Sequence, residues 1–197
     1  LLLWLTYVSR ALAEVEPLGA SFRTFEFSDS DFRRLQRMIF DFAGISLNSN
    51  KKPMAYSRLT KRLRQLGLDS FREYLDFVEA AGAEEKVRFI NALTTNLTYF
   101  FREPHHFTIL AEHLKKAYKG ETLTVWSAAC STGEEPYSIA MSVVEAFGTD
   151  QPPVRIIASD LDSDVLRAAE RGVYALDKVS SLPPPQLKRF FLKGKGE

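Results

Sequence analysis

Apolar residues recur at every third or fourth position between residues 28 and 96, which is the spacing of a helix with one buried face. This spacing predicts four short helices, within residues 28–44, 52–67, 69–82 and 83–96. A Ser/Asp cap opens the first helix, Asp69 is the predicted cap of the third, and Gly44 and Gly67 end the first two. Short helices with short links are typical of a small helical domain.

The period of the apolar pattern changes after a fifth predicted helix that begins at Pro104. Residues 122–130 and 154–162 are rich in β-branched residues and predict strands, whereas residues 133–148 and 163–172 keep helical spacing. Strand, helix, strand, helix is the order of a βαβ unit with a parallel sheet. A doubly wound domain usually has about five strands or more, so we expect a longer protein or a sheet completed by another molecule. Residues 181–197 are predicted to be a turn, a basic segment and a tail.

The first residues carry an apolar stripe of their own. Its members alternate steps of four and three: Leu1, Leu5, Val8, Leu12 and Val15. They predict an amphipathic leader helix that docks on this chain or on a second copy, which allows self-association. A targeting segment is the alternative, although the apolar run is short and no basic segment precedes it. The expected division is therefore a leader (1–20), a helical domain (21–93) and an α/β domain (94–197).

Composition limits the class of protein. Apolar residues make up 45% of the chain and charged residues 26%, as in soluble globular proteins, and the net charge is +1. A nearly neutral chain has no overall field that attracts nucleic acid. Cys130 is the only cysteine, which excludes an internal disulfide and suits a reducing compartment. We therefore expect a cytoplasmic protein with no nucleic-acid partner and no direct membrane insertion.

Two points along the chain follow the predicted strands, where parallel α/β sheets bind ligands. Small residues follow the first strand and would let a ligand approach the backbone; they are Ala128, Ala129, Ser131 and Gly133. The acidic pair Glu134 and Glu135 comes next and would repel a pyrophosphate, so a cationic or hydroxyl-rich ligand is favoured. Asp160 ends the second strand, where a carboxylate can accept both ribose hydroxyls of a nucleoside. S-adenosylmethionine has a ribose, a sulfonium and an ammonium group but no phosphate, and it fits this combination.

Three stretches then resemble one family. "TTNLTYFFREPHHF", "VWSAACSTGEEPYSIAM" and "ASDLDSDVLRAAERGVY" look like the chemoreceptor glutamate O-methyltransferases of the CheR family, in the same order. The resemblance runs from about Phe32 to the end of the chain. It implies a helical N-terminal domain, then a Rossmann-like methyltransferase domain with an inserted β-subdomain, at whose start this chain stops. It also implies methyl transfer from S-adenosylmethionine to glutamates of methyl-accepting chemoreceptors, leaving S-adenosylhomocysteine.

By position, the resemblance carries the family's cofactor contacts over to five residues: Asn96, Thr98, Arg102, Glu135 and Asp160. Arg102 is the strongly cationic member and the candidate catalytic residue. It could hold either the substrate carboxylate or the methionine carboxylate, and both assignments stay open. A glutamate side chain with a pKa of about 4.3 is already ionised at neutral pH, so no general base is required.

Residues 94–107 combine hydrogen-bonding groups with four aromatic rings: Tyr99, Phe100, Phe101 and Phe107. We expect this segment to join the two domains and to line the cofactor, with at least two of the rings serving only as core. His105 and His106 lack an acidic third ligand at a recognisable spacing, so a structural role at a helix start is favoured and no metal is expected. Cys130 is expected to be a small buried residue rather than a nucleophile.

The second predicted helix is strongly basic. Its cations lie beside the apolar face, and they are Arg58, Lys61, Arg62 and Arg64. They predict a dock for an acidic helical substrate, which the resemblance identifies as the cytoplasmic methylation helices of a receptor. A solvated face without a partner is the alternative.

Three functions can therefore be compared. The leading one is a protein-glutamate O-methyltransferase. A non-catalytic module of the same fold that binds receptors or S-adenosylmethionine is the first alternative. A helical nucleic-acid binder is disfavoured, because the charge is neutral and a helix-turn-helix signal is absent.

Overall fold

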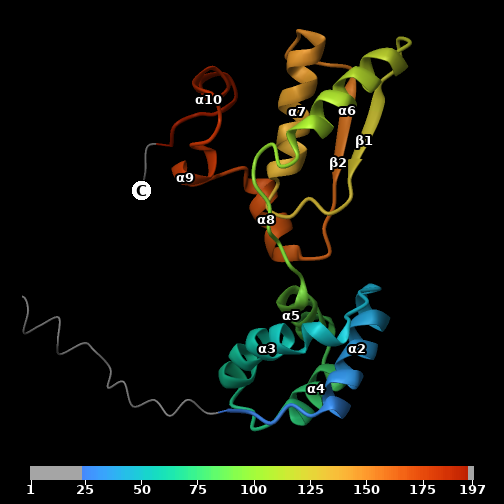
Figure 1. Ribbon diagram of the computed structural model, residues 1–197, viewed down its shortest axis with the longest axis vertical. Coiled ribbons are helices and arrows are strands. Elements are labelled where there is room, and N and C mark those ends of the chain that lie inside the picture. Colours follow the sequence, from blue (N-terminus) through green and yellow to red (C-terminus); the bar gives the residue numbers. More distant parts are fainter. Residues whose placement is uncertain (1–23, 195–197) are drawn as a thin grey trace, which may run out of the picture.

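The structure, a computed structural model, describes residues 24–194. The predicted leader helix and its apolar stripe lie outside the described residues. Figure 1 shows two halves stacked along the long axis, a helical half of residues 24–93 and an α/β half of residues 104–194. A linker, residues 94–103, connects them. Within the described part of the chain, every helix is too short or too polar to cross a membrane.

The helical half consists of α2 (Asp29–Ala43), η1 (Ser49–Lys51), α3 (Lys52–Leu66), α4 (Phe71–Ala80) and α5 (Ala83–Leu93). Ser28 caps α2 in a capping box, and Gly44 and Gly67 end α2 and α3 in the left-handed conformation, as predicted. The predicted Asp69 cap of α4 is wrong. Ser70 is the cap, because its hydroxyl accepts from the Glu73 backbone N–H over 3.2 Å and the buried ring of Phe71 then follows directly.

One apolar core holds these helices together. The buried side chains at helical spacing include Phe32, Leu35, Ile39, Leu59, Leu63, Phe71, Leu75, Val78 and Phe89. The fourth predicted helix ends earlier than residue 96, at Leu93, which is the last of its core positions. Thr94 has extended backbone, and from there the linker leaves the helical half.

The α/β half contains α6 (Pro104–Ala117), β1 (Leu123–Ser127), α7 (Glu134–Phe147), β2 (Val154–Ala158), α8 (Ser163–Arg171), α9 (Leu176–Val179) and α10 (Pro184–Phe190). The two strands pair in parallel, with Val125 opposite Ile156, so the predicted βαβ unit is confirmed. Alternate residues of both strands pack with α6 and α7 on one face of the sheet. On the other face Trp126 and Ile157 remain 68% and 45% exposed.

The end of the described chain is more ordered than the sequence predicted. Residues 176–190 hold the short helices α9 and α10 instead of only a turn and a basic segment. Val179 and Leu182 are buried against Phe100 and Met141, so packing on α7 and the linker fixes this segment. Local propensity is weak there, and the helices form because they cover an apolar surface.

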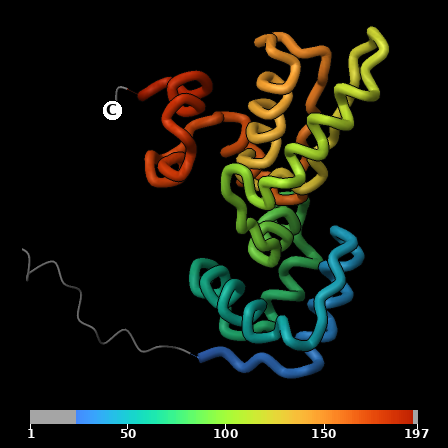
Figure 2. Tube along the Cα trace, turned by 45° about the horizontal axis from the view of Figure 1, so that its top comes forward, coloured from blue at the N-terminus to red at the C-terminus, as the bar shows by residue number. Residues whose placement is uncertain are grey.

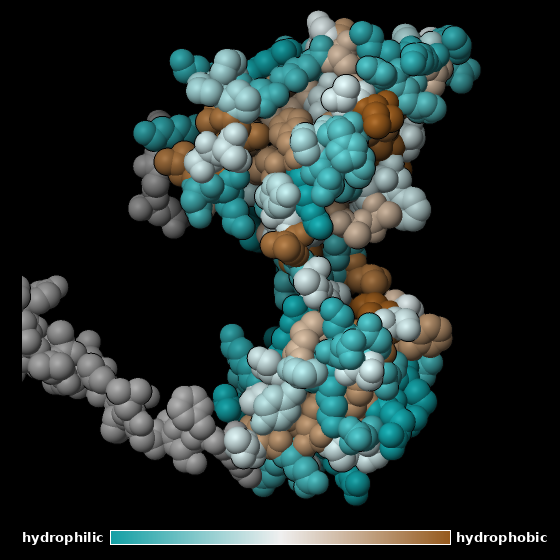
Figure 3. Space-filling model, in the orientation of Figure 1, coloured by the Kyte–Doolittle hydropathy of each residue, from teal (hydrophilic) through white to brown (hydrophobic). Residues whose placement is uncertain are grey.

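The two halves meet at a narrow waist. Figure 1 shows α5 below and α8 above this waist, and Figures 1 and 2 both show the linker, in green, running from α5 to the α/β half. Figure 3 shows the constriction on the molecular surface, with hydrophobic residues on both sides of it. Asn91 of α5 donates to Asp164 of α8 over 3.1 Å, so polar contacts as well as the covalent linker join the halves.

Candidate functional site

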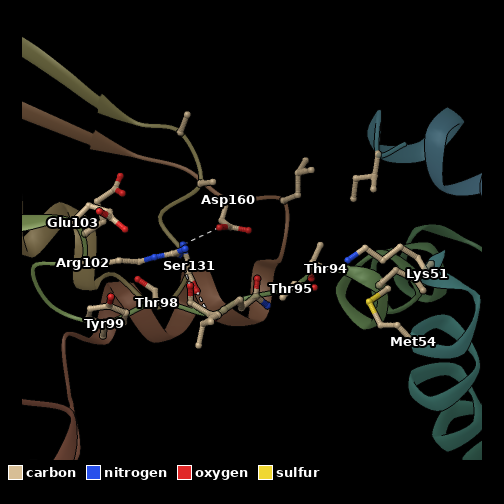
Figure 4. A pocket seen from close by; sticks show the side chains of 18 of the residues that line it. Lys51, Met54, Thr94, Thr95, Thr98, Tyr99, Arg102, Glu103, Ser131 and Asp160 are labelled. Carbon is tan, nitrogen blue, oxygen red and sulfur yellow. Dashed lines mark hydrogen bonds between the residues drawn. The ribbon is translucent and has the colours of Figure 1, made fainter. Parts of the chain in front are cut away.

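A cavity of about 610 Å³ lies between the two halves, at the carboxyl ends of β1 and β2. Figure 4 shows Lys51 and Met54 of the helical half on one side of it and Arg102 and Asp160 on the other. The linker forms the wall between them. The volume is in the range of small-molecule sites, and the place is the one where open α/β sheets bind ligands.

Ser131 organises the loop that follows β1. Its φ is +48°, a left-handed conformation that a residue with a side chain adopts at a cost of about 1–3 kcal/mol. In this conformation its backbone N–H donates to Asp160 Oδ2 over 2.8 Å, and its hydroxyl donates to the Asn96 carbonyl over 3.2 Å. One residue therefore connects the loops after both strands to the linker.

Asp160 lies at the end of β2 and lines the cavity, where the sequence placed it. Its Oδ1 accepts from the Asp162 backbone N–H over 2.9 Å and its Oδ2 from Ser131. A carboxylate oxygen has two lone pairs, so each oxygen retains one acceptor site. Helix capping falls to Asp162, which accepts from Asp164 N at the start of α8. Asp160 is thus held in place while it keeps the capacity to bind a ligand.

The two acidic residues at the start of α7 have different environments. Glu135 is exposed, lines the cavity and accepts from the Ser127 hydroxyl over 2.7 Å. Glu134 is only 2% exposed, is not part of the cavity wall and accepts from the Thr132 hydroxyl over 2.5 Å. The expectation that both carboxylates act on the ligand is wrong for Glu134, because the helix turns its side chain into the protein. Glu135 alone presents negative charge to the cavity from this helix.

Gly133 was expected to let a ligand approach the backbone, and this expectation is wrong. Its missing side chain instead makes room for neighbouring parts of the protein. Its φ is +99°, and a Cβ there would lie 2.7 Å from the Tyr174 hydroxyl and 2.9 Å from Ala169 Cβ of α8. The Tyr174 hydroxyl fills this space and donates to the Thr132 carbonyl over 2.7 Å. The missing side chain thus lets α8 and the residues after it pack against the loop. Ala128, Ala129 and Ser131 do line the cavity.

The linker contributes three of the predicted residues to the cavity wall: Asn96, Thr98 and Arg102. The amide of Asn96 donates to Asp162 Oδ2 over 2.6 Å, so its hydrogen-bonding capacity is partly used within the protein. The Arg102 guanidinium is exposed and donates to the Leu97 carbonyl over 3.0 Å, which leaves most of its five donors available. Arg102 is the better placed of these residues to hold an anionic group.

The aromatic rings of residues 94–107 fall into two groups, those in the cavity wall and those in the core. Tyr99 and Phe107 are part of the cavity wall. Phe100 is buried against Val179 and Leu182, and Phe101 packs edge-on against Phe107 at 5.2 Å between ring centroids. At least two rings thus serve the core, as predicted.

His106 also lines the cavity, a position that the sequence analysis did not assign. Its neighbour His105 is 61% exposed. Among residues 24–194, no three His, Cys, Asp or Glu side chains are grouped so that they could hold a metal ion. Cys130 is fully buried beside the site, and its burial, together with the negative charge of Asp160, raises the pKa of the thiol. A thiol that is buried and protonated is a poor nucleophile, as expected for a structural cysteine.

No pattern in the sequence indicated that the helical half lines the cavity. Lys51 and Met54 stand in a separate segment, and only the folded arrangement brings them opposite Asp160. Lys51 is exposed, so it adds a second cation to this wall together with Arg102. Ile45 and Leu47, from the segment after α2, add apolar surface.

Arg58 and Arg62, which were proposed for docking, are bonded inside the protein. The Arg58 guanidinium donates to the Thr94 carbonyl and, over 3.2 Å, to the Thr95 hydroxyl. It therefore fastens the start of the linker to α3. Arg62 pairs with Glu85 at 2.5 Å, and Glu85 is only 7% exposed.

The Arg62–Glu85 pair has further partners. The Tyr74 hydroxyl donates to Glu85 over 3.3 Å, and burial followed by the Glu85 charge raises the pKa of Tyr74. The hydrogen bond that Arg62 donates to Glu85 raises the pKa of Arg62. Lys61 is exposed, and the guanidinium of Arg64 lies 6.0 Å from the Phe25 ring centroid. Docking through this face stays a prediction, and Arg58 and Arg62 also have structural roles.

Known families match both halves. Residues 30–94 match the CheR methyltransferase all-alpha domain, and residues 96–197 match the CheR methyltransferase SAM binding domain. SAM here is S-adenosylmethionine. The two matches cover the helical half and the α/β half respectively, so the predicted fold class is confirmed.

Curated relatives agree with these matches. The chain is 51% identical over 170 residues to a chemotaxis protein methyltransferase of Salmonella typhimurium, covering 86% of this chain and 58% of that protein. It is 48% identical over 170 residues to the chemotaxis protein methyltransferase of Escherichia coli, covering 86% and 59%. Identity to chemotaxis protein methyltransferase 2 of Pseudomonas aeruginosa is 48% over 173 residues, covering 87% and 61%.

The chain thus spans 58–61% of the length of these relatives. All three relatives are named chemotaxis protein methyltransferases. The cavity lies within the matched region, and five predicted residues line it: Asn96, Thr98, Arg102, Glu135 and Asp160. From the folded site and these matches together, the chain belongs to the CheR family of S-adenosylmethionine-dependent methyltransferases.

Proposed function

We propose that this protein transfers a methyl group from S-adenosylmethionine to glutamate side chains of methyl-accepting chemoreceptors, as part of adaptation in chemotaxis. The observation that carries the proposal is the position of Asp160. Its carboxylate is braced at the end of β2 by one hydrogen bond to each oxygen, and it lines a cavity of about 610 Å³. Such a carboxylate suits the paired hydroxyls of a ribose.

The other residues of the wall fit the same ligand. Ala128 and Ala129 are small and leave room beside the backbone, and Glu135 offers a carboxylate to a cationic group. S-adenosylmethionine supplies a methyl group activated on a sulfonium sulfur. Asp160 would hold its ribose and Glu135 would attract its positive end. Asn96 and Thr98 would line it from the linker.

The cations of the cavity suit an acidic substrate. Arg102 and Lys51 are exposed and reach the cavity from the linker and from the helical half. One of them would hold the carboxylate of the target glutamate, and the other is then available for the methionine carboxylate. Because that glutamate is ionised at neutral pH, catalysis would rest on alignment rather than on a base, and alignment can contribute about 7–11 kcal/mol.

The receptor's cytoplasmic helices would approach across α3. Lys61 is exposed on that helix and would meet an acidic partner there. Arg58 and Arg62 would contribute mainly by holding α3 in place, given their bonds to Thr94 and Glu85. A cytoplasmic location follows from this proposed substrate, and self-association through the leader helix stays a prediction.

A transfer assay tests the proposal. The intact protein is incubated with S-adenosylmethionine labelled in its methyl group and with the cytoplasmic fragment of a chemoreceptor, and the fragment is then treated with alkali. A glutamyl methyl ester releases volatile labelled methanol, whereas methyl groups on nitrogen or sulfur stay bound. We expect alkali-labile label that disappears when the fragment's methylatable glutamates are replaced by alanine. Alkali-stable label, or none, would contradict glutamate O-methylation.

A further inference from the structure

We propose that Asp162 is a positioning residue that locks the linker onto the start of α8 and thereby fixes the cofactor-facing side chains of the linker. The inference rests on the proposed function only in that the cavity is the S-adenosylmethionine site. Asp162 is not in the cavity wall and is 4% exposed, so it would act through its neighbours.

The two oxygens of this carboxylate have separate tasks. Oδ1 accepts from the backbone N–H groups of Asp164 over 2.9 Å and Val165 over 3.4 Å, which caps α8. Oδ2 accepts from the Asn96 amide over 2.6 Å and lies 3.0 Å from the Thr94 hydroxyl, whose one proton it shares with the Asn91 carbonyl. A cap needs only the first oxygen. The second oxygen binds the linker, across more than sixty residues of sequence, since the Thr94 and Asn96 contacts span 68 and 66 positions.

The backbone of Asp162 connects this lock to the ligand carboxylate. Its N–H donates to Asp160 Oδ1 over 2.9 Å, and Asp160 Oδ2 accepts from Ser131. Ser131 in turn donates through its hydroxyl to the carbonyl of Asn96. Asn96 is therefore held from both its side chain and its backbone, and a closed ring of contacts joins the linker to both strand loops.

This closed ring of hydrogen bonds also fixes the position of the rest of the linker. Thr98 and Arg102 follow Asn96 by two and six positions in the sequence, and both line the cavity. On the other side of the ring, Arg58 ties Thr94 to the helical half. Asp162, at the start of α8, is thus connected through the linker to the helical half, and it would fix how Lys51 lies opposite Asp160.

Substitutions at Asp162 can separate the cap from the lock. Serine caps helices as well as aspartate does. Its side chain is shorter and has a single oxygen, which cannot bond the linker while it caps the helix. Asparagine caps equally well, and its side chain is as long as that of aspartate. Once the Asn96 amide has rotated by half a turn, its oxygen can accept a hydrogen bond from the side-chain N–H of the introduced asparagine. Alanine removes both functions. Asp162→Ser, Asp162→Asn and Asp162→Ala therefore form a matched series.

The first readout is the affinity for S-adenosylhomocysteine, measured by calorimetry on the intact protein. Losing hydrogen bonds to a charged acceptor predicts that Asp162→Ser weakens binding about tenfold, while Asp162→Asn stays close to wild type. If Asp162 were only a cap, Asp162→Ser would match wild type and only Asp162→Ala would lose affinity. That pattern would overturn the inference.

The second readout needs no ligand. Spin labels on cysteines at Ser57 of α3 and His113 of α6, both exposed, report the distance between the two halves, and buried Cys130 escapes labelling. We expect a narrow distance distribution in the wild type and in Asp162→Asn, and a broad one in Asp162→Ser and Asp162→Ala. An unchanged distribution in Asp162→Ser would overturn the lock.

The two measurements test the proposed function and the role of Asp162 separately. Failure of the wild-type protein to bind S-adenosylhomocysteine would contradict the proposed function, whereas the distance measurement would still test the lock. Normal binding in the wild type together with normal behaviour of Asp162→Ser would contradict the lock alone.

Discussion

The backbone N–H of Ser131 donates to Asp160 Oδ2 over 2.8 Å, and this bond joins the loops that follow the two parallel strands. Ser131 makes this bond from a left-handed backbone conformation, with φ of +48°. Phe101 and Glu103 of the linker have positive φ as well, at +54° and +56°. Such conformations in residues other than glycine concentrate at functional sites. Here all three lie in the two segments that meet around the cavity.

Replacing Asp160 with alanine should weaken the binding of S-adenosylhomocysteine strongly. Two charge-assisted hydrogen bonds to the ribose would be lost, at about 1.5–3 kcal/mol each. Calorimetry on the intact protein measures the change. The exposed Asp177→Ala on α9 is the control and should bind normally. Unchanged affinity in Asp160→Ala would show that the ribose assignment is wrong.

The strained backbone of Ser131 predicts that two substitutions there differ in stability. Ser131→Val places a β-branched residue in the left-handed region and should lower the free energy of unfolding by about 1–2 kcal/mol. Ser131→Gly relieves this cost and should stabilise the protein relative to Ser131→Val, although it loses the hydroxyl contact to Asn96. Urea denaturation measures both variants. Equal stability of the two would mean that the backbone at Ser131 is not strained.

Arg58 and Lys61 lie on the same helix but should respond differently to charge reversal. Arg58→Glu breaks the bond to the Thr94 carbonyl and should lower the melting temperature and the affinity for S-adenosylhomocysteine together. Lys61 is exposed, so Lys61→Glu should leave stability and cofactor affinity unchanged while raising the KM for the receptor fragment. A normal KM in Lys61→Glu would remove the support for docking across α3.

The Arg62–Glu85 pair predicts a coupled effect on stability. Glu85→Ala removes the partner of the half-buried Arg62 and leaves the buried Tyr74 hydroxyl without its acceptor, so it should lower the free energy of unfolding by about 1–3 kcal/mol. The double variant Arg62→Ala/Glu85→Ala should be less destabilised than the sum of the single variants. Additive effects in the double-mutant cycle would show that the two side chains do not interact.

Much of the fold could be predicted because its signals are local. Glycines in the left-handed conformation end α2, α3 and α8, and Gly44, Gly67 and Gly172 mark these ends in the sequence. Asp160 could be predicted because a strand end is recognisable from the apolar run before it. The choice between Asp69 and Ser70 as the cap of α4 was not predictable from local preference, since both residue types cap well.

The remaining features depend on contacts between distant segments. Lys51 enters the cavity only because the helical half folds against the linker. The role of Asn96 is set by Asp162, which is 66 positions away, and no spacing rule reports such a pair. Helices α9 and α10 form where Val179 and Leu182 can be buried on α7 and the linker, a surface that exists only after folding.

The most direct measurement is a crystal structure of the intact protein with S-adenosylhomocysteine. The account predicts that the ligand lies in the cavity between the halves, with its ribose hydroxyls on Asp160 and its amino-acid end toward Glu135 or Arg102. Ligand density in another place, such as the groove lined by Tyr137 and Leu166 between α7 and α8, would contradict the assignment of this cavity as the cofactor site.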